Sequence, residues 1–488
     1  MALASQAFRY NYIIIQSGSE GKPVDLSNQS EYIEYFENIM SPTITMNIKM
    51  VSTYNIVSRL PIRGGEMVSM EIETASGTFK FGSTSGGSSS KITEGSGELY
   101  VYKVENINQP STTMSYMLKL VSAEYFYNET SRCMKRYKSA TIDTHVSDIL
   151  ENTMKVPLDR IGTIEPTKNS YSFIGNTKKP FHTIQWLCPK SIVSAQQGVS
   201  GEGTDAEAVG TAGFLFYENR DGFNFRSIEG LVSETREYLG SSNPKQQGSD
   251  IHGPYIHQGT GAIGNPYDFG ENFKINYYHV NRMNDIRKAL SVGQFANKTI
   301  FFDALSHKAS IYDYKLPSKA ENKLGNDDSD ELPVPNDLRD LTSRLFVRVS
   351  DHGTLGIGTD GFETSGIDEA YQAKSASRYN ALFSQSIDIQ VPCNINLKVG
   401  DIINCIFPEL KDGESSGPQF DEQISGNYLI SRLNHHLQGN ASFTALNLIR
   451  DSYGYSQIKS SPTSSAPTTE VKKKYEINRD RQRRHRFI

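Results

Sequence analysis

The feature that most constrains the fold lies near the end of the chain, at residues 396–450. This stretch holds three runs rich in β-branched, aromatic and leucine residues, separated by polar segments: Asn396–Ile406, Ser425–Leu433 and Ser442–Arg450. In the first run, Gly400 and Asp401 precede an apolar segment, which is typical of a strand entered through a tight turn. The three runs, the first two separated by a polar loop, therefore predict an antiparallel meander of three strands with no room for catalytic loops.

Length and composition favour several β-rich domains. A chain of 488 residues is too long for one core and should divide into roughly two to four domains. The apolar fraction is 37%, the aromatic residues are mostly Tyr and Phe, and there are 39 glycines, which favours strands and turns over helical bundles. A net charge of −5 gives the whole chain no strong field that would attract nucleic acid.

The cysteines and the N-terminus indicate a cytoplasmic origin. No C-x-x-C pair occurs among the four cysteines, which are Cys133, Cys188, Cys393 and Cys405. We expect buried, reduced thiols, with neither a zinc site nor a disulfide framework. The longest apolar run near the start, Tyr12–Ile15, is too short for a signal peptide or a membrane span. The sequence thus predicts a soluble protein made in a host cytoplasm, without a membrane span.

Residues 1–122 predict a first small antiparallel β-barrel. Five β-prone runs are separated by Gly, Pro, Asn and Ser: Phe8–Gln16, Thr43–Val51, Glu66–Thr74, Glu98–Val104 and Met114–Val121. The Gly/Ser-rich segment between Phe81 and Ile92 cannot bury apolar surface, so we expect a flexible hairpin tip there.

This first module resembles the stretch near the end of the chain. Both contain a turn glycine, an acidic residue and an apolar strand, in Arg63–Val68 and in Lys398–Ile403. A spacing of 18 positions also recurs, between Tyr100 and Leu118 and between Tyr428 and Leu446. The pattern predicts two similar barrels in one chain; the alternative is chance, because β-hairpins resemble one another.

Residues 123–290 predict a mixed α+β domain. A helix is expected over Thr141–Met154, with Thr141 as its cap, and a second over Pro180–Leu187, with proline in its first turn. Phe214–Ile228 reads as two aromatic strands around a turn at Arg220–Gly222. Residues 235–275 predict an extended wrap, and Val280–Leu290 predicts another helix.

The second barrel is expected to comprise residues 291–316 and 384–455, interrupted by an insertion at 317–383. A hairpin of Thr299–Asp303 and Ala309–Tyr314 should open it, and Ile367–Phe383 should form a helix within the insertion. Residues 456–488 are rich in Ser, Pro, Lys and Arg and predict a flexible basic tail. Such a tail could dock on an acidic neighbour in an assembly or contact DNA.

Three motifs could carry chemistry, and each has a simpler structural interpretation. Gly259–Gly264 satisfies G-x-G-x-x-G, but no strand precedes it and Pro266 blocks a following helix, so we expect a loop. His435 and His436 are adjacent, so on a strand they point to opposite faces, and no carboxylate or cysteine is placed to complete a metal site.

The remaining candidate is the pair Glu218 and Asp221, which lies among aromatic residues as a sugar-cleaving carboxylate pair would. A hairpin does not fix the separation that hydrolysis requires, and Asp221 fits the turn itself. The chain contains no G-x-S-x-G, H-E-x-x-H or P-loop motif. We therefore expect a protein that is not an enzyme and has no catalytic residue, metal or cofactor.

Two groups of residues resemble a known family. The three late runs, and the pair formed by Asn176–Leu187 and the Phe214–Ile228 hairpin, are similar to segments of the central baseplate hub of contractile-tailed, T-even-like bacteriophages. Type VI secretion spike proteins carry a related barrel. The resemblance implies a mainly β fold with an α+β insert, built from two similar antiparallel β-barrels of the tail-tube type and a mixed α/β domain.

The same resemblance implies a structural role in a virion. Three copies would form a homotrimeric ring with pseudo-sixfold symmetry, joining the sixfold tail tube protein to the trimeric central spike protein and other baseplate proteins. DNA would pass through its lumen without specific binding. The alternatives are a glycan-degrading or glycan-binding tail protein and the hub of a bacterial contractile secretion system.

Overall fold

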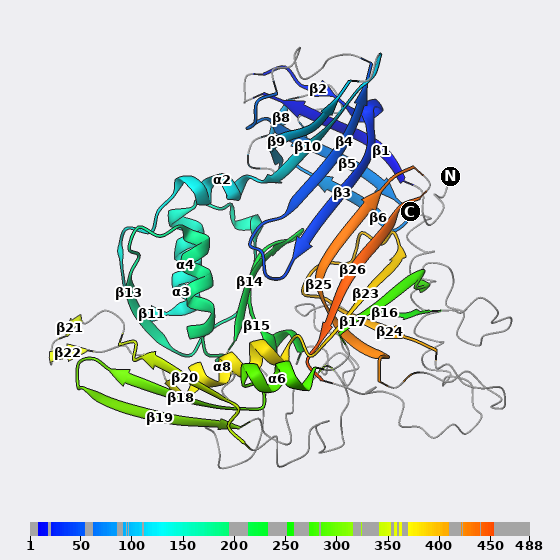
Figure 1. Ribbon diagram of the computed structural model, residues 1–488. Coiled ribbons are helices and arrows are strands. Elements are labelled where there is room, and N and C mark those ends of the chain that lie inside the picture. Colours follow the sequence, from blue (N-terminus) through cyan, green and yellow to red (C-terminus); the bar gives the residue numbers. More distant parts are fainter. Residues whose placement is uncertain are drawn as a thin grey trace, which may run out of the picture.

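Figure 1 shows a computed structural model of the chain. The structure describes residues 8–452 apart from 18–20, 54–61, 85–90, 94, 96, 110–111, 195–212, 233–250, 258–272, 283–284, 316–323, 325–340, 353–355, 359–360, 364–368, 409–420, 422 and 440. The Gly259–Gly264 loop, most of the Gly/Ser-rich hairpin tip and the basic tail at 456–488 lie outside the described residues. None of the helices in the described part is long and apolar enough to cross a membrane.

A 14-stranded sheet dominates the molecule, and nearly all of its neighbouring strands are antiparallel. Eight strands come from the first part of the chain: β1 (Phe8–Gln16), β2 (Val24–Asp25), β3 (Ser30–Asn38), β4 (Thr45–Ser52), β5 (Met67–Thr74), β6 (Gly77–Phe81), β9 (Leu99–Asn108) and β10 (Met114–Ser122). Six come from the second: β16 (Ile251–Ile256), β17 (Tyr277–Arg282), β23 (Gln385–Pro392), β24 (Ile402–Ile406), β25 (Gly426–Leu437) and β26 (Phe443–Arg450). Two short strands, β7 (Ser83–Thr84) and β8 (Ile92–Thr93), pair separately.

Each group of strands curls into a barrel. In the first, the order is β3-β4-β10-β9-β5-β1, and β2, which precedes β3 through a 3-10 helix at Ser27–Gln29, pairs with β1. In the second, the order is β17-β23-β26-β25-β24-β16, and a bridge between Ile256 and Lys274 closes the circuit. Alternation along the strands fills the interior with apolar side chains, such as Ile48 and Leu446. The predicted fold class is confirmed.

The two barrels repeat the same backbone pattern at their glycine turns. The counterparts are Gly65 N–H to Val101 O (2.7 Å) with Val101 N–H to Glu66 O (2.9 Å), and Gly400 N–H to Ile430 O (3.2 Å) with Ile430 N–H to Asp401 O (3.0 Å). Leu118 and Leu446 also correspond, because they pair with Ile48 and Ile389 on equivalent strands. The predicted repeat is confirmed, although the counterpart of Tyr100 is Leu429 rather than Tyr428.

One strand in the repeat runs in the opposite direction. β1 is antiparallel to β5, whereas β16 occupies the corresponding place beside β24 and is parallel to it. The chain therefore enters its two barrels from opposite ends.

The barrels are joined edge to edge by β3 and β25. These strands pair antiparallel from Asn38 with Arg432 to Ile33 with Leu437. In Figure 1 the β25–β26 hairpin rises from the second barrel to reach the first. β3 is absent from the strands predicted for residues 1–122, so the sequence gives no expectation of this junction.

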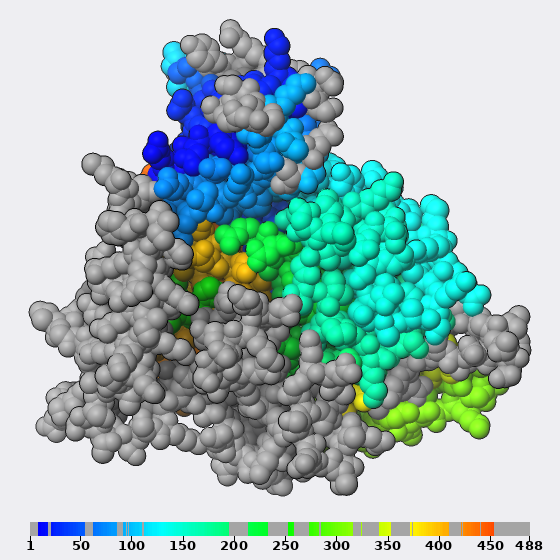
Figure 2. Space-filling model, turned by 180° about the vertical axis from the view of Figure 1, so that it is seen from behind, coloured from blue at the N-terminus to red at the C-terminus, as the bar shows by residue number. Residues whose placement is uncertain are grey.

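The mixed region packs beside the first barrel, where it forms the cyan and green surface of Figure 2. Its elements are α2 (Ala123–Thr130), β11 (Arg136–Thr141), α3 (Ile142–Asp148) continued by a π-helix (Ile149–Thr153), 3-10 helices at Leu158–Arg160 and Cys188–Lys190, β12 (Ile161–Ile164), β13 (Ser170–Ile174), α4 (Pro180–Leu187), β14 (Phe214–Asn219) and β15 (Gly222–Ser227). The predicted helices and the β14–β15 hairpin are confirmed. The helix that begins after Thr141 buries Ile142 and Val146 in a core that also contains aromatic residues such as Phe214 and Phe225.

The second barrel differs from its prediction in its opening strands. Residues 286–381 form α6 (Ile286–Val292), β18 (Ala296–Asp303), β19 (Lys308–Lys315), β20 (Arg344–Val349), β21 (Gly356–Gly358), β22 (Gly361–Glu363) and α8 (Glu369–Ala381). The predicted hairpin, β18–β19, pairs with β20 in a separate three-stranded sheet and is not part of the barrel.

The barrel takes β16 and β17 instead, from the segments expected to be a wrap and a helix. The helix predicted over Val280–Leu290 is wrong at its start, because β17 extends to Arg282 by pairing with β23. The predicted helix at Ile367–Phe383 corresponds to α8. The division of the chain into domains at residues 122, 290, 316, 383 and 455 stays a prediction.

Candidate functional site

The β14–β15 turn and the Lys398–Asp401 turn meet β3 and β25 in one place. We call these four elements the barrel junction. The backbone N–H of Glu218 in β14 reaches Ser41 O beyond β3 at 3.4 Å, and the side chain of Arg220 donates to Ile395 O at 2.7 Å. The hairpin of the mixed region therefore binds both barrels at the point where they join.

Glu37 on β3 lies at the centre of the barrel junction and is 2% exposed. Its carboxylate accepts hydrogen bonds from the hydroxyl of Tyr35 (2.6 Å), the backbone N–H of Arg220 (2.8 Å) and the backbone N–H of Val399 (2.8 Å). One side chain thus joins the first barrel, the hairpin turn and the second barrel. The alternation of buried Ile33 and Tyr35 before it is the sequence signal that could have identified β3.

Glu37 gives the junction a pH dependence. Burial raises the pKa of Glu37 to about 7, with a contribution from the Asp401 carboxylate, although its three hydrogen bonds act in the other direction. The raised pKa means that the Glu37 carboxyl binds its proton more tightly in the folded protein than in the unfolded chain. The free energy of unfolding should therefore fall by up to about 3 kcal/mol as the pH rises from about 4.5 to about 7.

The measurement is the thermal midpoint of the wild type and of Glu37→Gln between pH 5 and pH 8. The variant cannot titrate at this position, so its midpoint should change less with pH. Equal pH dependence in the two proteins would show that Glu37 does not titrate as proposed.

The hairpin turn also packs against the glycine turn of the second barrel. Tyr217 lies over Gly400, whose φ of +93° belongs to the left-handed region that favours glycine. Lys398 donates to Asp221 at 2.6 Å, and the side-chain amide of Asn219 donates to Val399 O at 3.3 Å. Side chains of both turns therefore hold the hairpin turn against the glycine turn of the second barrel.

Glu218 is the most buried charged group of the junction. Its Oε2 accepts from the backbone N–H of Ile44 (2.9 Å) and from the hydroxyl of Ser122 (2.7 Å), and its Oε1 binds Arg160 Nη2 at 2.5 Å. Arg160 Nε is 3.6 Å from the carboxylate of Glu124. Burial and Glu124 raise the pKa of Glu218, while Arg160 opposes that shift.

The two carboxylates weighed for glycan cleavage lie in different environments. Glu218 is fully buried and bound by three donors, whereas the Asp221 side chain is 54% exposed and pairs with Lys398. Hydrolysis requires two carboxyl groups flanking a substrate, and Glu218 has no exposure through which it could reach one. Sequence reasoning located the residue but missed its partners Arg160, Glu124 and Ser122, which are distant in the chain.

The two adjacent histidines contact neighbouring side chains of the sheet on opposite faces. His435 is buried beside Tyr35, where its Nδ1 lies 2.9 Å from the hydroxyl of Thr444, and burial lowers the pKa of its imidazole to about 3. His436 lies on the other face, 3.6 Å from the Glu34 carboxylate. Among the residues that the structure describes, no three His, Cys, Asp or Glu side chains are grouped so that they could hold a metal ion.

The four cysteines are buried and unpaired with one another. Burial raises the pKa of Cys393 to about 12 and also raises the pKa values of Cys188 and Cys405. These three thiols are therefore protonated at neutral pH and poorly suited to nucleophilic chemistry.

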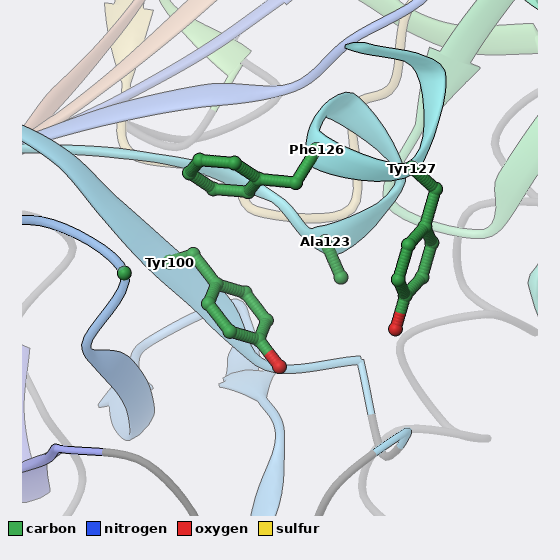
Figure 3. A pocket seen from close by; sticks show the side chains of 5 residues that line it. Tyr100, Ala123, Phe126 and Tyr127 are labelled. Atoms are coloured by element: carbon green, nitrogen blue, oxygen red, sulfur yellow. The ribbon is translucent and has the colours of Figure 1, made fainter. Parts of the chain in front are cut away.

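A small apolar pocket lies at the glycine turn of the first barrel. Its volume is about 200 Å³, and it is lined by Gly65, Tyr100, Ala123, Phe126 and Tyr127. Figure 3 shows the aromatic rings arranged around the opening. No atom lies within 4 Å of the position that a Cβ of Gly65 would take. The pocket is thus the open counterpart of the place where Tyr217 covers Gly400 in the second barrel.

Comparisons with known proteins give a likeness in structure only. No family model matches the chain, and no curated protein matches its sequence. The tail protein from Neisseria meningitidis MC58 is similar in structure, with 11% identity and a TM-score of 0.47, over 91% of this chain and 97% of that one. The 43 kDa tail protein of prophage MuSo2 from Shewanella oneidensis has 9% identity and a TM-score of 0.45, over 91% and 99%.

The E. coli c3393 protein, a component of the type VI secretion system, has 10% identity and a TM-score of 0.37, over 92% of this chain and 78% of that one. None of these similarities transfers a residue role or a partner to this chain.

Proposed function

We propose that the chain is the structural subunit of a phage tail baseplate hub. Three copies form a ring of pseudo-sixfold symmetry that joins a sixfold tail tube to a trimeric central spike, within the baseplate of a virion. The proposal combines the sequence resemblance of the late strands and the Phe214–Ile228 hairpin with the geometry of the barrels.

The observation that carries the proposal is the repeat. The chain holds two barrels with the same strand order and the same pair of backbone hydrogen bonds at Gly65 and Gly400. Three such chains around a threefold axis present six similar barrels. A trimeric ring of this kind can therefore match the six subunits in one layer of a sixfold tail tube. The β3–β25 junction fixes the two barrels relative to each other, so that one chain supplies two adjacent positions of the ring.

The charge of the chain suits a passage for DNA. Each Lys or Arg that reaches a phosphate adds salt-dependent binding, which would slow a polymer in transit. A net charge of −5 supplies no general attraction of that kind. DNA would accordingly pass through the lumen without specific binding.

Mass and shape test the proposal. We expect the purified protein to have the mass of three chains of 54.5 kDa each by light scattering, and six lobes around a channel in electron-microscopic averages. It should also bind a trimeric spike protein from the same tail. A stable monomer that neither trimerises nor binds the spike would refute the proposal.

A test of activity addresses the glycan alternative. If Glu218→Gln or Asp221→Asn abolished a glycan-hydrolysing activity while the protein remained folded, the structural interpretation would fail. We expect no such activity to be lost, because Glu218 is enclosed by Ile44, Ser122 and Arg160.

A further inference from the structure

The way in which β25 meets β3 suggests how successive copies join. β25 has two parts along one edge: Gly426–Leu429 pairs with β24, and Arg432–Leu437 pairs with β3 of the first barrel. Its other edge pairs with β26. The second part of β25 therefore extends beyond its own barrel and completes the edge of the next one.

β9 is the counterpart of β25 in the first barrel and has the same two parts. Leu99 and Tyr100 pair with β5, and the other edge pairs with β10. Beyond Tyr102, no strand in the described part of the chain pairs with the edge that corresponds to the β3-binding edge of β25. Among the described residues, the backbone donors and acceptors on this edge of segment 103–108 thus pair with no strand.

β17 is the counterpart of β3 and has the complementary edge. Ile33 and Tyr35 of β3 pair with Ile48 and Met46, as Tyr278 and Val280 of β17 pair with Ile389 and Ile387 on the equivalent strand. The outer edge of β3 receives β25. The outer edge of β17 ends the sheet and receives no strand among the described residues.

On this basis, which rests on the proposed ring, we infer that β9 of one copy pairs antiparallel with β17 of the next copy. The contact repeats between chains the β25–β3 junction that each chain makes within itself. Every barrel in the ring then has the same neighbours, and the ring closes after three copies. An isolated chain cannot satisfy both edges, because they belong to opposite ends of its pair of barrels.

The intrachain junction sets the expected register. His435 pairs with Tyr35, which places Ile107 opposite Val280; Asn434 pairs with Phe36, which places Glu105 opposite Arg282. Asn106 and Asn281, which lie where the β9–β10 and β17–β23 registers shift, then face each other. The bulge at Asn106 in β9 thus lies opposite the bulge at Asn281 in β17, so neither one interrupts the pairing of the residues on either side.

Side chains on the two edges complement one another in this register. Ile107 is 55% exposed, which is unusual for a large apolar residue on a β-edge, whereas His435, its counterpart in β25, is 1% exposed. Pairing brings Ile107 against Val280 and Glu105 across from Arg282. Within one chain the Glu105 carboxylate is bound by Lys103 and Lys119, each at 2.6 Å, and Arg282 donates to Phe383 O at 3.0 Å. Addition of a strand from a second copy thus covers Ile107 and brings a further cation beside Glu105.

Disulfide cross-linking tests the register. In the full-length protein, Ile107→Cys combined with Val280→Cys should form interchain disulfides under mild oxidation, with a covalent trimer as the largest product on a denaturing gel. Directly opposed residues of antiparallel strands lie within disulfide range. The four native cysteines are buried, so each single variant should give no interchain product. A matched control, Ile107→Cys with Asn281→Cys, points its thiols to opposite faces and should not cross-link.

The outcomes separate this inference from the proposed function. A trimer by light scattering that yields no covalent trimer, or that cross-links equally in the control, overturns the strand pairing and leaves the ring intact. A protein that remains monomeric overturns both.

A charge reversal checks the same contact if the cysteine variants do not fold. Glu105→Arg should weaken trimerisation by about tenfold, and adding Arg282→Glu should restore it. Circular dichroism would show that the barrels are intact. Equal weakening in the single and double variants would contradict the pairing.

Discussion

Gly400→Ala is expected to destabilise the protein by about 3 kcal/mol or more. An added Cβ would lie 2.3 Å from Tyr217 Oη and 2.9 Å from its Cζ, which is closer than van der Waals contact allows. The φ of +93° adds about 1–2 kcal/mol for any residue with a Cβ, and overpacking adds about 1–3 kcal/mol. The hairpin turn would have to move away from the barrel junction to accommodate the methyl group.

Gly65→Ala is the matched control, because the repeat places Gly65 at the same position of the first barrel. Its φ is +91°, yet nothing lies within 4 Å of an added Cβ. The substitution should therefore lower the free energy of unfolding by about 1–2 kcal/mol, which is the cost of a positive φ for a residue with a Cβ. The difference between the two alanine variants measures the contact with Tyr217.

The combination Gly400→Ala with Tyr217→Phe sharpens the test. Removal of the hydroxyl deletes the closest atom, so the double variant should be less destabilised than the sum of the single changes, as a double-mutant cycle reports. The measurement is the denaturation midpoint of each variant by circular dichroism. Equal losses for Gly65→Ala and Gly400→Ala would show that Tyr217 does not pack on the turn.

Local patterns in the sequence were sufficient for the elements with strong short-range signals. β1, α4 and the Phe214–Ile228 hairpin follow from alternation, an N-terminal proline and a turn glycine. The glycine turns at Gly65 and Gly400 revealed the repeat, since both require the same backbone conformation before an acidic residue. These features depend on residues within a few positions of one another.

The missed strands depend on partners that are distant in the chain. β17 pairs with β23 more than a hundred residues later, and β3 pairs with β25 some four hundred residues later. No short-range pattern fixes such pairings, so local signals alone predict a helix from Val280 and place β18–β19 in the barrel. The same holds for the site: Glu218 was recognised from its hairpin, but only the fold shows that Arg160 neutralises it.

Arg160→Ala is the second substitution with a large expected effect, about 3–5 kcal/mol, because it leaves two buried carboxylates without their cation. Arg160 is 12% exposed at its side chain, Glu218 0% and Glu124 5%. The loss should be smaller at pH 5 than at pH 8, since burial already raises the pKa of Glu218 and removal of the guanidinium raises it further, so that protonation relieves the uncompensated charge.

The control for this prediction is Lys135→Ala, which breaks the exposed ion pair between Lys135 and Asp148, 2.5 Å apart, with Lys135 49% exposed. Exposed pairs contribute at most about 1 kcal/mol, so this variant should remain close to wild type. Adding Glu218→Gln to Arg160→Ala should recover part of the stability, because the buried charge is then removed together with its partner. If Arg160→Ala and Lys135→Ala lowered the denaturation midpoint equally, the buried Glu218–Arg160 contact could not be a major source of stability within the mixed region.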